Sequence, residues 1–260
     1  ELAAAQFILQ KEEELAKQPK QKKVDYTLLP LTALIDKYIE SRLALNRSLT
    51  TIQDYRCIQR NGFQDLMQIC VKDMDKELLQ ESVNMESKRP CNRKKGATLS
   101  PKRLQNEWSL IASVIRKYTS SLDDVLRNIE LPEVPDRVPD LIPAEALLPA
   151  IKGNELELAV LLAAWLSFSM SEIRGLTKSK SISGDHIRIA EVVVVVGGKD
   201  HRKEIAKNKY RNRTHRIPPY IKSLIDKVPG DRLVTLTEAQ IYHKWIKFQD
   251  EHRFKHMTFH

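Results

Sequence analysis

The spacing of hydrophobic residues divides the chain into a helical first half and a mixed second half. In the first half apolar residues recur every three or four positions, which is the period of an amphipathic helix. One helix start is marked by a serine followed by a proline, since serine caps a helix and proline fits its first position. Four helices are predicted in this way, over residues 31–45, after Ser48 or Thr50, over 73–85 and after Ser100-Pro101.

A proline-rich connection separates the two halves. Pro132, Pro135, Pro139 and Pro143 recur in this stretch, and proline disfavours helix both at its own position and at the preceding residue. We therefore expect four parts along the chain. They are a linker helix or stalk over residues 1–25, a helical domain over 26–130, a linker over 131–142 and a second domain over 143–260.

The second half combines helical spacing with strand signals. Five consecutive valines end a β-branched stretch over 186–196, and Gly197-Gly198 then offers a hairpin turn into a strand over 202–206, with a third strand over 213–217. Helices are expected over 143–152, 155–168, 171–176, 219–227 and 238–249. The predicted fold class is α+β: an all-α helical bundle followed by a mixed α/β domain with a small antiparallel sheet.

Composition limits the classes of protein to which this chain can belong. Hydrophobic residues make up 42% of the chain, which suffices for packed cores and argues against wholesale disorder. No apolar run reaches the length of a membrane span, and no secretory signal opens the chain. Cys57, Cys70 and Cys91 are odd in number and lack CxxC spacing, which indicates reduced thiols in the cytosol.

Basic residues are in excess and clustered. The chain carries 43 Lys and Arg against 34 Asp and Glu, a formal charge of +9. Residues 88–104 contain no acid, and residues 202–216 contain only Glu204. Such clusters suit the neutralisation of phosphates with release of counterions, so we expect a nucleic-acid partner rather than a merely solvated face. The basic residues expected to bind it are Lys88, Arg89, Arg93, Lys94, Lys95, Lys102, Arg103, Lys209, Arg211 and Arg213.

Three strings of the second half resemble motifs of the tyrosine recombinases, the DNA-cutting integrases of phages and conjugative transposons. They are SMSEIRGL at 169–176, AKNKYRNRTHRIPPYI at 206–221 and HMTFH at 256–260. The resemblance covers residues 30–260 and implies a core-binding and a catalytic domain that clamp double-stranded DNA. It further implies a tyrosine that attacks one phosphodiester to form a 3′-phosphotyrosyl link, without ATP, metal or other cofactor.

The resemblance also implies active-site residues. Lys207 falls on the family's hairpin lysine and is the expected general acid, with Lys209 as the alternative in register and contact with the DNA backbone as the alternative role. His260 falls on the first histidine of the family's histidine box. Ser169 stands where the family has a phosphate-clamping arginine, so either this clamp is lost or Arg174 fills the role through a local shift.

Several further expectations follow from the resemblance. The family's nucleophilic tyrosine comes after its histidine box, so no tyrosine of this chain is assigned that role, and we expect a fragment that is inactive as it stands. His252, His256 and His260 recur at four-residue spacing, but without HExxH order no metal site is expected.

The implied assemblies are a homodimer on DNA and a tetrameric synapse, with an accessory directionality factor, in the bacterial cytoplasm and associated with the nucleoid. Two other interpretations remain. The first is a non-catalytic DNA-binding protein with a recombinase-like fold. The second is an RNA-binding protein that uses the basic hairpin, although the chain lacks the exposed aromatic runs of RNA-binding sheets.

Overall fold

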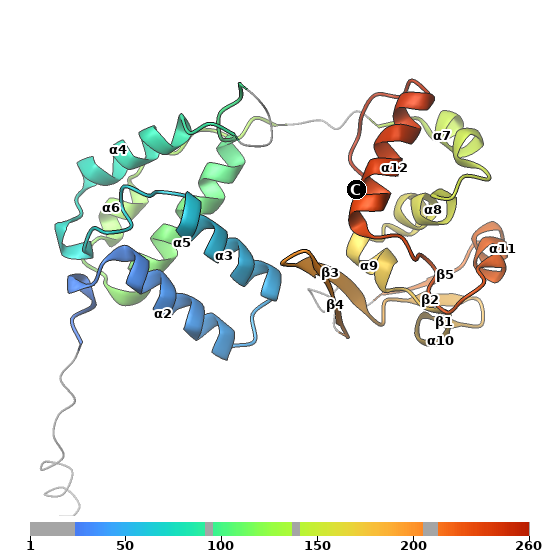
Figure 1. The fold of residues 1–260 in the computed structure, drawn as a ribbon, viewed down its shortest axis with the longest axis horizontal. Helices are drawn as coiled ribbons and strands as arrows, with labels where there is room; N and C mark the ends of the chain where they lie inside the picture. The colour runs from blue at the N-terminus through green and yellow to red at the C-terminus, as the bar shows by residue number, and fades with distance from the viewer. Residues whose placement is uncertain (1–23, 92–95, 137–140, 205–212, 260) are drawn as a thin grey trace, which may run out of the picture. The chain divides into compact units, whose positions relative to one another are not determined.

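In a computed structural model of the chain, residues 24–91, 96–136, 141–204 and 213–259 are described (Figure 1). The chain divides into two compact units. The first contains the residues up to Ser41 together with Ile58–Glu133, and the second contains Arg42–Cys57 together with Val134–His260. The division at residues 25, 130 and 142 that the sequence suggests stays a prediction.

In the described part of the chain before residue 130, all regular secondary structure is helical. The predicted helices over 31–45, after Ser48 and after Ser100-Pro101 are confirmed, and the third begins at Lys76 rather than Asp73, because the Asp75 carboxylate caps it by accepting from Leu78 N at 2.8 Å. A short helix after residue 122 was not predicted. The order is η1 (Tyr26–Leu28), α2 (Leu31–Ala44), α3 (Leu49–Asn61), η2 (Val71–Asp73), α4 (Lys76–Ser87), α5 (Pro101–Tyr118) and α6 (Asp123–Arg127), where η marks a 3-10 helix.

Helix α5 shows how local sequence and packing agree. The Ser100 hydroxyl accepts from the Arg103 amide at 3.3 Å and Pro101 occupies the first turn, as the sequence predicts. The apolar positions that recur at helical spacing along α5 are all buried, and the ring of Trp108 lies 5.7 Å from that of Phe63. Burial of one apolar face therefore holds this helix in the core of the first unit.

The second unit combines helices with two small antiparallel sheets (Figure 1). Its core is formed by apolar side chains of the helices, of the strands β2 and β3, and of Ile217 just after β5. The predicted α+β class is confirmed. The order is α7 (Ala144–Ile151), α8 (Glu157–Leu166), α9 (Met170–Gly175), α10 (Lys178–Ser181), β1 (Ile182–Ser183), β2 (His186–Arg188), β3 (Val192–Val196), β4 (Lys199–Lys203), β5 (Thr214–Arg216), α11 (Pro219–Lys227) and α12 (Glu238–Glu251).

The strand predicted over 186–196 is wrong in one respect, because it forms two strands in two sheets. Strand β2 pairs with β1 and β5, whereas β3 pairs with β4 through the predicted turn, in which Gly197 and Gly198 have φ of 59° and 76°. The break coincides with a close approach of two backbones. A Cβ on Gly175 at the end of α9 would lie 2.1 Å from the Glu191 carbonyl oxygen, so the chain turns away from β2 where α9 packs.

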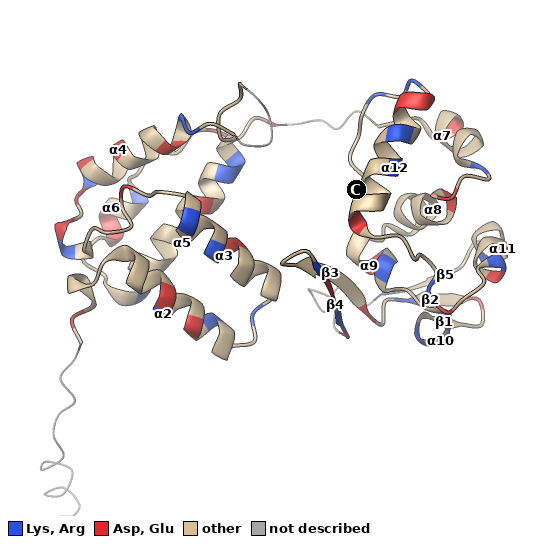
Figure 2. Cartoon of the chain, in the orientation of Figure 1, with Lys and Arg blue, Asp and Glu red and all other residues tan. Residues whose placement is uncertain are grey.

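Charge is mixed over most of the described helices. Helices α2 and α12 carry both basic and acidic residues and α4 is mainly acidic, so none of these helices is uniformly basic (Figure 2). None of the described helices is long and apolar enough to cross a membrane. The cationic excess of the chain is therefore concentrated in the two segments that the sequence identifies, 88–104 and 202–216.

Candidate active site

The predicted site residues fall into a described and an undescribed group. The described ones are Lys88, Arg89, Lys102, Arg103, Arg174 and Arg213. The assignments that lie outside the described residues stay predictions, and they concern Arg93, Lys94, Lys95, Lys207, Lys209, Arg211 and His260.

Arg174, one of the two alternatives for the phosphate-clamping arginine, is buried among acidic partners. Its side chain is 4% exposed, its Nη2 donates to Asp200 Oδ2 at 2.5 Å and its Nη1 lies 3.9 Å from Glu238 Oε2. Its Nε donates to the Leu236 carbonyl at 3.4 Å. These contacts tie α9 to the β3–β4 hairpin and to the start of α12. Because a phosphate could bind Arg174 only in place of them, its catalytic role stays a prediction.

A double-mutant cycle between Arg174→Met and Asp200→Asn tests the internal role of Arg174. We expect each substitution to lower the free energy of unfolding, and the two effects to be non-additive by about 1 kcal/mol, because both remove the same ion pair. The measurement is chemical denaturation of the four proteins. Additive effects would show that the pair does not hold the hairpin, and would leave Arg174 available for a phosphate.

Ser169 caps the short helix α9 in a reciprocal arrangement. Its amide donates to Glu172 Oε2 at 2.7 Å, in a capping box in which the serine side chain faces the backbone at Glu172. The hydroxyls of Ser169 and Ser171 lie 3.3 Å apart. Glu172 is 2% exposed, so its carboxylate is fixed at the start of α9. The position at which the family has an arginine therefore presents two hydroxyls beside a buried carboxylate.

Arg213 reaches this same position from the residue before β5. Its Nη2 donates to the Ser167 carbonyl and lies 3.9 Å from Glu172 Oε2, and its guanidinium carbon lies 5.5 Å from the centre of the Phe168 ring. Its Nε donates to His215 Nε2 at 2.9 Å. Burial, with a smaller contribution from Arg213, lowers the pKa of His215, which keeps this imidazole neutral and able to accept. The sequence assigned Arg213 to DNA binding but could not reveal these partners.

A pocket in the second unit joins the three motif strings. The first string contributes Ser169 and Glu172, the second contributes Arg213, and the third contributes Met257 and Phe259. These strings are far apart in sequence, yet their side chains line one cavity. The cavity is polar where it meets α9, and most of the remaining lining is apolar, including Leu147, Leu148, Val160, Ala163, Trp165 and Trp245.

The third string is held against α12. Trp245 Nε1 donates to the Met257 carbonyl at 3.0 Å, and Gln249 Oε1 accepts from the Met257 amide at 2.7 Å. The Phe259 ring meets the Trp245 ring edge-on, with 5.8 Å between the ring centres. Phe259, the residue before His260 in the third string, is therefore part of the pocket wall that faces α9 from α12.

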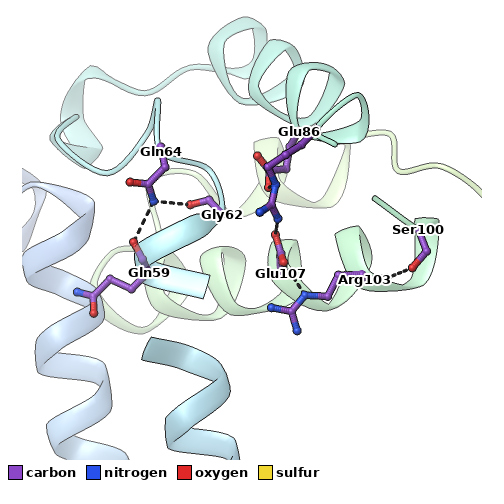
Figure 3. Close-up of polar contacts among 8 residues, drawn as sticks. Gln59, Gly62, Gln64, Glu86, Ser100, Arg103 and Glu107 are labelled. Carbon is purple, nitrogen blue, oxygen red and sulfur yellow. Dashed lines mark hydrogen bonds and ion pairs between the residues drawn. The ribbon is translucent and has the colours of Figure 1, made fainter. Parts of the chain in front are cut away.

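The described basic residues of segment 88–104 are two arginines that pair with buried carboxylates and two exposed lysines. Arg103 Nε donates to Glu107 Oε1 at 2.5 Å and Arg89 Nη2 to Glu107 Oε2 at 2.8 Å, while Arg89 Nε lies 2.6 Å from Glu86 Oε1. Figure 3 shows Glu107 between Arg103 and Glu86. Lys88 and Lys102 are exposed. The acidic partners lie just outside the basic segment 88–104, so its charge is partly neutralised within the fold.

The pKa of Glu86 makes the stability of the first unit depend on pH. Burial raises this pKa to about 7; Arg89 opposes the shift, and the neighbouring carboxyl of Glu107 adds to it. The ordinary value is 4.5, so between these two values the folded protein binds more protons than the unfolded one. The stabilisation from Glu86 is therefore complete below the ordinary value and is lost as the pH rises through the folded value.

We expect the first unit to be more stable at pH 5 than at pH 8 by about 1–2 kcal/mol on account of Glu86, after allowance for solvent screening. Glu86→Gln should remove this part of the pH dependence. The measurement is hydrogen exchange of α5 amides at several pH values in both proteins. Parallel pH profiles for wild type and Glu86→Gln would contradict the assignment.

Comparison with known proteins identifies the fold. No protein-family model matches this sequence, and no curated protein is significantly similar to it. Among solved structures, the Tn1549 transposon integrase in complex with a circular intermediate DNA matches with a TM-score of 0.65 at 18% identity, over 88% of this chain and 80% of that one. This likeness extends over both units.

Phage integrases give similar matches. Lambda integrase bound to DNA has a TM-score of 0.60 at 12% identity, over 88% of this chain and 80% of that one. A lambda integrase tetramer bound to a Holliday junction has a TM-score of 0.57 at 13% identity, over 98% of this chain and 77% of that one. These proteins are tyrosine recombinases, so the chain has a tyrosine recombinase fold, as the motif strings predict.

Proposed function

We propose that this protein is a site-specific DNA recombinase of the tyrosine class, which integrates or excises a mobile element. The observation that carries the proposal is that Ser169, Arg213 and Phe259, from three separate motif strings, line one pocket in a tyrosine recombinase fold. Solved proteins of similar fold are integrases in complex with DNA. The basic segment 88–104 and its exposed lysines supply a surface for phosphates outside the pocket.

The proposed reaction transfers a phosphodiester to a tyrosine and back. The tyrosine hydroxyl loses its proton to water and its oxygen attacks the scissile phosphorus, the bond to the 5′-oxygen breaks, and a 3′-phosphotyrosyl link forms. Lys207 gives its proton to the leaving 5′-oxygen, and His260 completes the shell around the phosphate. Negative charge grows on the non-bridging oxygens in the transition state, so guanidinium and hydroxyl donors stabilise it. Religation reverses these steps and needs no external energy source.

The proposed assembly is a dimer on each DNA site and a tetramer in the synapse. Two of the solved proteins of similar fold are a lambda integrase dimer on a core site and a lambda integrase tetramer on a Holliday junction. An accessory directionality factor would select integration or excision. Analytical ultracentrifugation of the protein bound to its recombination site tests the assembly. We expect a dimer on one site and a tetramer when two sites are joined.

A non-catalytic DNA-binding protein is the second candidate. The observation that favours it is the serine at position 169 together with the burial of Arg174, since neither presents a guanidinium to the pocket in the way that the family pattern requires. Both candidates predict binding to duplex DNA. Only the recombinase predicts a covalent protein–DNA product.

Binding to duplex DNA is expected to weaken steeply with salt. Replacing Lys88 and Lys102 by glutamine should lower the slope of log K against log salt by about 0.9 for each lost phosphate contact. Lys76→Gln, an exposed lysine at the start of α4, is the matched control and should leave the slope unchanged. The measurement is fluorescence anisotropy of a labelled duplex, with structured RNA as competitor. Equal slopes for all variants would show that Lys88 and Lys102 do not contact phosphates. Competition by structured RNA as strong as that by duplex DNA would favour the RNA-binding interpretation.

A further inference from the structure

The pocket has a polar end that is suited to an anion, although its expected arginine is absent. Serine at position 169 offers a single hydroxyl, which cannot form the paired donor contacts of a guanidinium with a phosphate. The Ser169 hydroxyl also lies 3.3 Å from that of Ser171. If a phosphate binds here, its negative charge must be met by a cation from another part of the chain.

Arg174 is poorly placed to provide that cation. It does not belong to the pocket lining, and its guanidinium is held by Asp200 and the Leu236 carbonyl on the side of α9 that faces the hairpin and α12. Releasing it would uncover a buried charge and break the contacts that connect three elements. A local shift that brings Arg174 into the pocket is therefore costly.

Arg213 has the required position and charge. Among the described residues that line the pocket it alone carries a positive charge, and its side chain is 30% exposed. Its Nε and Nη2 are occupied by His215 and the Ser167 carbonyl. Arg213 lines the pocket together with Ser169 and Ser171, so part of its side chain faces the space that an anion would occupy.

The surroundings of Arg213 hold its guanidinium in place before any ligand arrives. Ser167 adopts left-handed backbone angles, φ 54° and ψ 33°, at the end of α8, and its carbonyl accepts from Arg213. The buried Phe168 ring lies under the guanidinium and meets the His215 ring edge-on, with 5.4 Å between centres. A donor fixed in this way binds an anion without first losing side-chain freedom, which is the condition for effective stabilisation of a transition state.

The Glu172 carboxylate limits how an anion can bind. Its Oε2 lies 3.9 Å from Arg213 Nη2 and already accepts from the Ser169 amide at 2.7 Å. The negative charge of Glu172 therefore attracts the Arg213 guanidinium, although at 3.9 Å these two atoms do not form a hydrogen bond. An anion that reaches the serine hydroxyls also lies near this carboxylate, so the positive charge of Arg213 must offset the repulsion between them.

We propose that Arg213 supplies to the scissile phosphate the guanidinium that position 169 lacks, with the hydroxyls of Ser169 and Ser171 as additional donors. The proposal rests on the proposed recombinase function for the identity of the phosphate. Arg213 then acts as a catalytic residue contributed by the strand β5 side of the pocket instead of by α9.

The first test measures anion binding without requiring catalysis. Orthophosphate is titrated into the isotope-labelled 260-residue protein, and the amide signals of Ser169 and Ser171 are followed by nuclear magnetic resonance. We expect saturable shifts in the wild type and in Arg188→Gln, an exposed arginine on β2 whose register partner is Thr214. We expect none in Arg213→Gln. Absence of shifts in the wild type, or equal shifts in Arg213→Gln, would overturn the proposal.

The second test measures covalent cleavage by the full-length protein on a nicked duplex that carries its recombination site. Arg213→Gln should slow formation of the adduct about 100-fold or more, as loss of one preorganised donor does elsewhere. Arg213→Lys should recover part of the rate, because it keeps the charge but not the paired donors. Adding Ser169→Arg to Arg213→Gln should rescue cleavage, which a merely structural role of Arg213 does not predict.

The outcomes of the two tests separate the two proposals. A wild-type rate in Arg213→Gln overturns the role of Arg213 and leaves the recombinase assignment intact. A wild-type protein that binds orthophosphate at Arg213 but forms no adduct contradicts the recombinase assignment and leaves the anion site intact. Thermal melting of each variant shows whether a lost activity reflects unfolding.

Discussion

Replacing Gly175 by alanine is expected to destabilise the second unit by about 3 kcal/mol or more, or to prevent its folding. The added Cβ would lie 2.1 Å from the Glu191 carbonyl oxygen, 2.6 Å from its carbon and 2.8 Å from the Val192 Cα. All three atoms belong to the backbone, so no side chain can rotate away to make room. Helix α9 or strand β3 must move instead.

The effect should extend to the candidate site, because α9 carries Ser169, Glu172 and Arg174 towards their partners. Glu191 is also anchored by its side chain, which pairs with Lys180 and accepts from Arg202 at 2.8 Å. The region cannot easily yield, since both the backbone and the side chain at this position are fixed.

Thermal denaturation and hydrogen exchange of α8 and α11 amides measure the expected loss. Gly230→Ala is the matched control, because a Cβ at Gly230 meets no atom within 4 Å, and it should melt like the wild type. A Gly175→Ala protein with the stability of the Gly230→Ala protein would show that α9 and β3 are not in close contact.

Replacing Glu107 by alanine is the second substitution with a large expected effect, a loss of about 3 kcal/mol in the first unit. Glu107 is 1% exposed and accepts from both Arg89 and Arg103, which are about one-third exposed or less. Its removal leaves two guanidinium groups without their buried partner, and it leaves a cavity beside α5. The partial exposure of the arginines limits the loss, because water can solvate them.

The matched control is Asn106→Ala, one position earlier on the exposed face of α5. It should be neutral or slightly stabilising, since alanine favours helix. Native-state hydrogen exchange of α4 and α5 amides gives the free energy of the first unit. Equal values for the two alanine variants would contradict the structural role of the Glu107 cluster.

Gly62 provides an independent check of this cluster. A Cβ on Gly62 would lie 2.7 Å from Glu107 Oε2, which is the end of a flexible side chain. Gly62→Ala should therefore cost less in a Glu107→Ala background than in the wild type, because the obstructing oxygen is gone. Equal costs in both backgrounds would place the Glu107 carboxylate elsewhere.

Local signals account for most of the fold that could be predicted from the sequence. Ser100-Pro101 locates the start of α5, and Gly197-Gly198 locates the β3–β4 turn. The break in the strand over 186–196 could not be predicted, because its cause is the contact of Gly175 with a backbone that is 16 residues away in sequence. The β propensity of these residues predicts that a strand forms, but tertiary packing determines where that strand ends.

The candidate site shows the same limit. Runs of basic residues identify 88–104 and 202–216, but the fold decides which of these residues face solvent. Glu86 and Glu107 lie just outside the basic segment 88–104, so counting its charges does not reveal them. The four-residue spacing of Arg103 and Glu107 is nevertheless typical of helical ion pairs. The contact of Arg213 with Ser167, 46 residues apart, has no local signal.

The most direct test of the central claim is the trapping of a covalent intermediate. The full-length protein is incubated with a nicked duplex that carries its recombination site, selected from random-sequence DNA by binding, and the product is analysed by denaturing electrophoresis and mass spectrometry. We predict a tyrosine joined to a 3′-phosphate and a free 5′-hydroxyl on the released strand. Tight, salt-sensitive binding without any covalent product would contradict the recombinase assignment and favour a DNA-binding protein without catalysis.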